Sequence, residues 1–259
     1  MKNTLNNNHL KREISLFSAT VLVIANMVGT GIFTTSGFIM EELGDPKIML
    51  LCWFVGGVFA LTGALCYGEL GALFPEAGGE YVFLRESFGK GVAFLSGWIS
   101  LIVGFSAPIA AAAIAFGTYF FRMFPVTGHL DYTLPLLDIP ILTISPVTIL
   151  AVIAILVFSL VHYHSLSFGT KVQNGLTLFK VGLILVFIIG GLWLGDGSIE
   201  HFAGDLNMGS IIDGKFAVSL IFVSFAYSGW NAAAYLGGEI RKPAKNLPLA
   251  LLTGTVIVM

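Results

Sequence analysis

The sequence predicts an all-α, polytopic membrane protein. Hydrophobic residues make up 56% of the 259 residues and charged residues only 11%, whereas an ordinary soluble domain has about 25% charged residues. Apolar stretches long enough to cross a bilayer recur along the chain, and two of them are interrupted by glycines at their centres. The net charge of −2 favours neither a nucleic acid nor an acidic partner. The apolar composition makes the lipid bilayer the expected surrounding.

Six apolar segments have membrane-spanning length. They cover residues 14–40, 48–74, 92–121, 144–161, 172–194 and 216–238. The first five fall within residues 14–195, and the sixth opens a second group, residues 216–259. A seventh segment begins near Leu247 and ends at Met259, after about 13 residues or roughly 20 Å of helix, short of a hydrocarbon core of about 30 Å. We therefore expect a fragment or a truncated product.

The basic residues predict the orientation. With residues 1–13 in the cytoplasm, the cytoplasmic side receives Lys2, Lys11, Arg12, Arg85, Lys90, Lys171, Arg241, Lys242 and Lys245. The opposite side receives only Lys47, Arg122 and Lys215. This distribution predicts a multi-pass protein of the cell membrane with a cytoplasmic amino terminus. Residues 123–143 and 195–215 then become external loops, the first without regular structure, and Pro108 offers a bend point in the long third segment.

The first apolar segment is interrupted by Gly29-Thr30-Gly31. Glycine lowers helix stability by about 1 kcal/mol per residue, so we expect the helix to stop and restart here. Unwinding would free the amides of Thr30, Gly31 and Ile32, which suit a carboxylate, and carbonyls near residues 25–28, which suit an ammonium. The alternative is that Gly29 and Gly31 merely allow another helix to approach.

The sixth segment contains a second interruption, residues 225–231, with a serine, a glycine, an asparagine and three aromatic residues. Broken first and sixth helices are the pattern of an inverted five-helix repeat, in which the two breaks meet near the midplane. Carbonyls around Phe225 to Ser228 could complete an ammonium site, and Phe225 could cover it as a gate. The alternative for Phe225, Tyr227 and Trp230 is plain packing.

Lys180 lies about eight residues into the fifth segment, where a charged ammonium costs a few kcal/mol and needs a partner. One possible role is to stand where a sodium ion would otherwise bridge the first and fifth helices, donating to freed carbonyls near Gly29. The other is proton coupling, because burial favours the neutral amine. The alternative to both is snorkelling towards the cytoplasm.

The sequence contains no metal-ligand cluster, nucleophile elbow, phosphate loop or catalytic triad. We therefore expect neither enzymatic activity nor a cofactor nor a metal site.

Together these motifs resemble the amino acid-polyamine-organocation (APC) transporter superfamily, and within it the L-type amino acid exchanger branch. The resemblance covers nearly all of residues 14–259 and rests on four stretches. They are Val28 to Phe33, Tyr67 to Pro75 with the following Gly78 to Arg85, Phe225 to Asn231, and Gly238 to Pro243.

The resemblance implies a LeuT-like fold of two inverted five-helix repeats with discontinuous helices 1 and 6, here truncated in helix 7. It implies that Thr30 and Gly31, with Gly29 and Ile32 beside them, take the substrate carboxylate. It also implies that the carbonyls of Met27, Phe225 and Ser228 take the amine, with Asn231 in the site and Phe225 as the gate. Lys180 matches the family lysine that makes sodium unnecessary.

The leading functional hypothesis is therefore sodium-independent secondary transport of amino acids by alternating access, as exchange or proton symport. The alternative is a truncated membrane protein that binds an amino acid, or assembles with a partner, without transporting.

Overall fold

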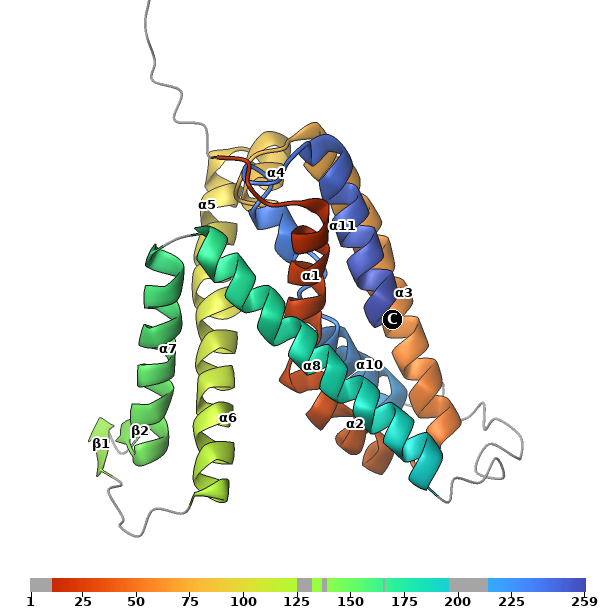
Figure 1. Ribbon diagram of the computed structural model, residues 1–259, viewed down its shortest axis with the longest axis vertical. Helices are drawn as coiled ribbons and strands as arrows, with labels where there is room; N and C mark the ends of the chain where they lie inside the picture. Colours follow the sequence, from red (N-terminus) through yellow and green to blue (C-terminus); the bar gives the residue numbers. More distant parts are fainter. Residues whose placement is uncertain (1–10, 125–131, 137–138, 165, 196–213) are drawn as a thin grey trace, which may run out of the picture. The chain divides into compact units, whose positions relative to one another are not determined.

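A computed structural model describes residues 11–124, 132–136, 139–164, 166–195 and 214–259 (Figure 1). Residues 1–10 of the predicted cytoplasmic segment and most of the predicted external loop 195–215 lie outside the described residues. The chain divides into two compact units. One comprises residues 1–89 and 171–259, and the other residues 90–170.

The smaller unit begins with a long helical stretch formed by α5 (Lys90–Ile99), a π-helical segment η1 (Ser100–Ser106) and α6 (Ala107–Met123). Pro108 stands in the first turn of α6 and has no backbone N–H to donate, which explains why the regular hydrogen-bond ladder changes just before it. The Ser106 hydroxyl donates to the Leu101 carbonyl at 2.6 Å within this segment. The helix is thus π-helical just before Pro108, the residue predicted as a bend point.

The predicted loop 123–143 is not without regular structure. Strands β1 (Tyr132–Leu136) and β2 (Ile139–Ile144) form an antiparallel pair with an irregularity between Leu134 and Pro135. Pro135 and Pro140 lie opposite each other in this pair. Proline is tolerated in both strands because each strand of a two-stranded sheet is an edge strand. The prediction of an all-α chain is thus correct for the bulk but misses this hairpin. The unit is completed by α7 (Pro146–His164), which packs against α6.

The larger unit contains α1 (Leu16–Met27), α2 (Thr30–Leu43), α3 (Pro46–Leu73) and α4 (Glu80–Phe88). Later in the chain it contains α10 (Gly214–Ala226), the 3₁₀ turn η3 (Ala232–Tyr235) and α11 (Pro243–Val258). Helix α8 (Leu166–Leu194) begins in the smaller unit and runs mainly through the larger one. Helix α11 packs against α1 and α3, while α10 packs against α2 and α3.

Local sequence explains several helix ends. The Ser15 hydroxyl accepts the Ser18 N–H at 3.2 Å and caps α1, and the Asp45 carboxylate accepts the Lys47 N–H at 2.8 Å ahead of Pro46. Gly44 ends α2 in the left-handed conformation (φ +64) that a C-terminal glycine adopts without strain. These signals fix the turn between α2 and α3.

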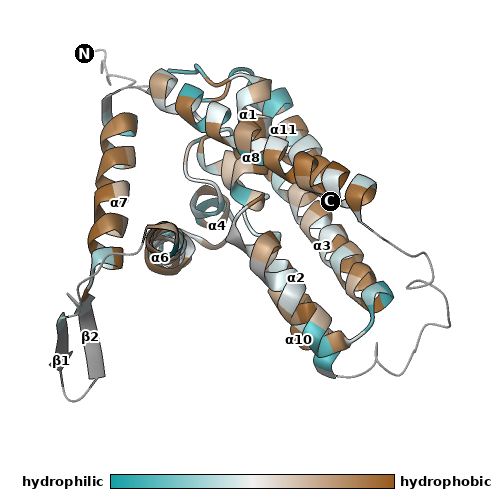
Figure 2. Cartoon of the chain, turned by 60° about the horizontal axis from the view of Figure 1, so that its bottom comes forward, coloured by the Kyte–Doolittle hydropathy of each residue, from teal (hydrophilic) through white to brown (hydrophobic). Residues whose placement is uncertain are grey.

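Among the described residues, four helical stretches are long and apolar enough to cross a membrane: Pro46–Leu73, Lys90–Met123, Pro146–Tyr163 and Ser167–Leu194. Helices α1 and α2 form a fifth such stretch if their bent pair counts as one span. Figure 2 shows hydrophobic residues around much of α7 and along α3, and a helix that is apolar on all sides suits lipid. The chain is a multi-pass membrane protein.

The sixth predicted segment is not one continuous helix. Helix α10 covers only its first part and ends at Ala226, after which turns and η3 take over. The seventh segment starts earlier than expected, at Pro243, because proline is suited to the first turn of a helix.

Candidate functional site

The first helix breaks at the glycine motif. Helix α1 ends at Met27, Gly29 is extended (φ −107, ψ −160), and α2 restarts at Thr30. The two helices are bent by 44°. The amides of the first turn of α2 have no intrahelical acceptor, and Gly29 provides no side chain to cap them. They form the positive end of the helix dipole, which suits an anion. The side chain of Thr30 lies outside the described part of the structure.

The second break follows α10. The Tyr227 amide donates the last helical bond, to the Val223 carbonyl at 2.9 Å, and the chain then turns at Gly229 with φ +104. This positive φ favours glycine. The Ser228 amide donates to the Phe225 carbonyl at 3.0 Å, and the Ala232 amide to the Gly229 carbonyl at 3.0 Å. The backbone therefore leaves the helical path within the predicted interval.

The two breaks contact each other. A Cβ at Gly31 would lie 2.9 Å from the Ala226 Cα, and one at Gly229 would lie 2.8 Å from the Asn26 carbonyl carbon. Gly29 has no such neighbour, since its Cβ would meet only the Asn26 oxygen at 3.9 Å. Close helix approach therefore explains Gly31 and Gly229, whereas a Cβ at Gly29 would make only an ordinary van der Waals contact.

Lys180 joins α8 to the end of α1. Its Nζ donates to the Ala25 carbonyl at 3.0 Å and to the Val28 carbonyl. Ala25 lies in the last turn of α1 and Val28 directly follows the helix, where backbone acceptors lack helical donors. Six residues earlier on α8, the Asn174 amide donates to the Ser18 hydroxyl at 3.2 Å. Sequence reasoning named the lysine but missed Asn174, which carries no charge to mark it.

Two of the three carbonyls proposed for an ammonium already accept one donor each. The Met27 carbonyl accepts the Gly29 amide at 2.9 Å, and the Phe225 carbonyl accepts the Ser228 amide. A carbonyl oxygen has two lone pairs, so each can accept a second donor. The Phe225 side chain is 73% exposed at the end of α10, which leaves its ring room to move.

The Asn231 side chain is hydrogen-bonded to a carboxylate. Its amide Nδ2 donates to the Glu80 carboxylate at 3.4 Å, and the Glu80 side chain also lies within hydrogen-bonding reach of the Tyr67 and Tyr235 hydroxyls. Sequence reasoning assigned no role to Glu80, Tyr67 or Tyr235. Two features of the sequence pointed to them: an acidic residue follows Gly78-Gly79, and the two tyrosines are polar residues within the apolar segments 48–74 and 216–238.

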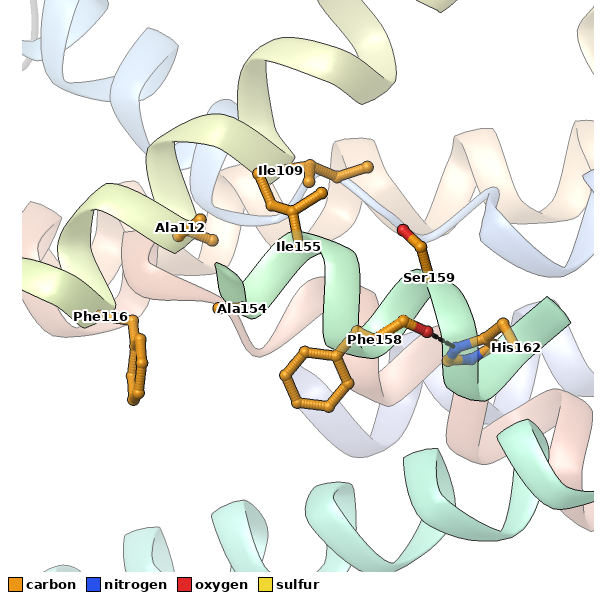
Figure 3. Close-up of a pocket in the computed structure, with 9 residues that line it drawn as sticks. Ile109, Ala112, Phe116, Ala154, Ile155, Phe158, Ser159 and His162 are labelled. Carbon is orange, nitrogen blue, oxygen red and sulfur yellow. Dashed lines mark hydrogen bonds between the residues drawn. The ribbon is translucent and has the colours of Figure 1, made fainter. Parts of the chain in front are cut away.

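The smaller unit contains a separate apolar groove between α6 and α7, of about 700 Å³. Figure 3 shows Ile109, Phe116, Ile155 and Phe158 along it, with the His162 ring held by a 2.9 Å bond from its Nδ1 to the Phe158 carbonyl. The groove includes none of the predicted site residues. Within the described ranges, no group of three or more His, Cys, Asp or Glu side chains could hold a metal ion.

Comparison with known proteins gives consistent matches. The amino acid permease family matches residues 14–259. The serine/threonine exchanger SteT of Bacillus subtilis is 34% identical over 251 residues, covering 97% of this chain and 53% of that protein. The large neutral amino acids transporter small subunit 2 of Rattus norvegicus is 32% identical over 254 residues, covering 96% of this chain and 45% of that protein.

A third relative, the b(0,+)-type amino acid transporter 1 of Mus musculus, is 32% identical over 252 residues, covering 96% of this chain and 49% of that protein. The chain thus spans about half the length of the curated relatives it matches. The family match covers nearly the whole chain and agrees with the resemblance seen in the glycine motifs. The chain belongs to the amino acid permease family of the APC superfamily.

Proposed function

We propose that this protein transports amino acids across the cell membrane by alternating access, without sodium, as an exchanger or a proton symporter. Its amino terminus lies in the cytoplasm. The printed names of the relatives, a serine/threonine exchanger and two amino acid transporters, support the substrate class. Transport requires no covalent chemistry.

The substrate site lies at the break of the first helix. The amides of Thr30, Gly31 and Ile32, with Gly29 beside them, bind the substrate carboxylate at the amino-terminal dipole of α2. The carbonyls of Met27, Phe225 and Ser228 bind the ammonium. Support comes from the contact between the two breaks, in which Gly31 packs against Ala226. Phe225 covers the bound molecule as a gate, and Asn231 contributes to the substrate site.

Lys180 provides the observation on which the proposal depends. Its ammonium bonds to the carbonyls of Ala25 and Val28, and a cation bound to backbone carbonyls at a broken helix is what a coupling sodium ion provides in this kind of fold. A fixed ammonium therefore replaces the ion. Its proton is also the coupling proton if the mechanism is symport.

Uptake into proteoliposomes tests the proposal. Labelled serine, threonine, leucine and alanine are offered with sodium or choline as the external cation, with or without internal amino acid, and with or without a pH gradient. We expect saturable uptake of at least one amino acid at equal rates in sodium and choline. Stimulation by internal amino acid indicates exchange, and stimulation by a pH gradient indicates symport. Absence of saturable uptake in every arm, or a requirement for sodium, contradicts the proposal.

A further inference from the structure

The loop that precedes α4 is hydrogen-bonded to the segment that follows the second break. The Gly78 amide donates to the Tyr235 carbonyl at 3.0 Å, and Ala77 pairs with Leu236 as an antiparallel bridge. The contact is close, because a Cβ at Gly237 would lie 2.6 Å from the Glu76 carbonyl oxygen. The segment after α10 is thus bonded to this loop through its backbone.

Glu80 adds side-chain bonds at the same place. It is the first residue of α4 and is half-buried. Its carboxylate accepts the Asn231 amide at 3.4 Å and has the Tyr67 and Tyr235 hydroxyls within hydrogen-bonding reach. One carboxylate therefore gathers donors from α3, from the turn after Gly229 and from η3.

Aromatic packing makes this arrangement rigid. The Tyr67 ring meets the Trp230 ring edge to face, with centroids 4.9 Å apart, and the Phe83 ring of α4 at 5.3 Å. Trp230 and Asn231 directly follow Gly229. Hydrogen bonds to an ionised acceptor are stronger than neutral ones, and a half-buried donor that loses its acceptor keeps the cost of desolvation. The position of the residues after the second break thus depends on the Glu80 carboxylate.

We propose that Glu80 is a positioning residue, whose carboxylate holds Asn231, Tyr235 and Tyr67 together and so fixes the unwound part of the sixth helix for substrate binding. This inference rests on the proposed amino acid transport. Glu80 does not touch the substrate; it acts through the segment that contains the carbonyl of Ser228 and the side chain of Asn231.

The test compares Glu80→Gln with Glu76→Gln. Glu76 lies in the same loop, but its side chain is 60% exposed and pairs with Arg85 at 3.0 Å, so its loss should change little. For Glu80→Gln we expect KM for uptake to rise on the order of tenfold, with kcat changed much less. Glu76→Gln should stay within about twofold of the parent. An unchanged KM in a folded Glu80→Gln protein overturns the proposal.

Tyr235→Phe gives an independent arm that preserves the aromatic ring. We expect it to raise KM as well, and the Glu80→Gln, Tyr235→Phe double variant to be no worse than Glu80→Gln alone, because both changes act on the same bond between Tyr235 and residue 80. Effects that multiply in the double variant contradict the shared network. If Glu80→Gln does not fold, an unchanged KM in Tyr235→Phe overturns the proposal.

Hydrogen–deuterium exchange separates this proposal from the proposed function. Amides of residues 228–240 should exchange faster in Glu80→Gln than in the parent or in Glu76→Gln. If the parent transports no amino acid, the proposed function fails while this exchange still reports the positioning role. Equal exchange in all three proteins overturns the role of Glu80.

Discussion

Gly229 leaves no room for a side chain next to Asn26. A Cβ added there would lie 2.8 Å from both the carbonyl carbon and the Cβ of Asn26, and Gly229 has a φ of +104. The second break thus packs directly against the end of the first helix. The Asn26 side-chain amide bonds back to its own helix, donating to the Leu22 carbonyl at 2.9 Å.

Replacing Gly229 with alanine should destabilise the protein more than replacing Gly44. Both have positive φ, but a Cβ at Gly44 would meet nothing within 4 Å. Gly44→Ala should therefore cost about 1 kcal/mol for the backbone alone, and Gly229→Ala about 1–3 kcal/mol more for the steric conflict. Thermal melting of the purified variants measures the difference. Equal shifts in melting temperature would mean that Asn26 moves to accommodate the added Cβ, and would contradict the steric argument.

Gly31→Ala tests the contact between the two broken helices. Its Cβ would lie 2.9 Å from the Ala226 Cα, which is backbone and cannot rotate away, so we expect a loss of about 1–3 kcal/mol and weaker amino acid uptake. Gly37 lies on the same helix with nothing within 4 Å of its Cβ. Gly37→Ala is therefore the matched control and should be neutral or stabilising by up to about 1 kcal/mol. The opposite order of melting temperatures contradicts the packing argument.

Lys180→Ala should abolish transport, because the carbonyls of Ala25 and Val28 would lose the cation that joins them to α8. Lys171 lies on the same helix and is exposed, so Lys171→Ala provides the control and should transport at nearly the parental rate. Initial rates of uptake into proteoliposomes with matched protein content give the comparison. Undiminished transport in Lys180→Ala refutes the role assigned to the ammonium.

The buried carboxyl group of Glu239 should make the stability of the folded protein depend on pH. Burial, with a smaller contribution from the Glu13 carboxylate, raises the pKa of Glu239 above its ordinary value of 4.5, and Oε2 is buried without a hydrogen-bond partner among the described groups. The folded protein therefore binds this proton more tightly than the unfolded chain. Its contribution to stability is complete below about pH 4.5 and is lost as the pH rises through the raised pKa.

Glu239→Gln should remove this loss. We expect the variant and the parent to melt together near about pH 4 and the variant to melt higher near about pH 8, since the glutamine carries no charge to desolvate. Glu76→Gln, at an exposed carboxylate, serves as the control and should follow the parent at both values. A constant gap between Glu239→Gln and the parent at every pH would assign the effect to packing.

The sequence by itself determined the membrane class and the break of the first helix. Apolar length reports directly on the bilayer, and Gly29-Thr30-Gly31 weakens a helix wherever it stands. The family resemblance also followed from local motifs such as Phe225 to Asn231. Lys180 was identifiable because an isolated charge in an apolar segment requires a partner.

Other features depended on tertiary contacts. The hairpin of β1 and β2 was missed because Pro135 and Pro140, taken alone, indicate a loop. They are tolerated in strands here because both strands of a two-stranded pair are edge strands. The sequence could not show which glycines are required by close packing. A Cβ at Gly29 would make only an ordinary contact, whereas a Cβ at Gly31 or Gly229 would collide with Ala226 or Asn26.

The acceptors of Lys180 and the donors of Glu80 were decided by the tertiary structure alone. Lys180 lies 155 residues from Ala25, and Glu80 lies 151 residues from Asn231. Apolar patterning reports which residues leave water, but a hydrogen bond between distant segments depends on how the helices pack, and one sequence contains no record of that distance. The residues that break the helices were therefore visible in the sequence, while the bonds that hold the breaks in place were not.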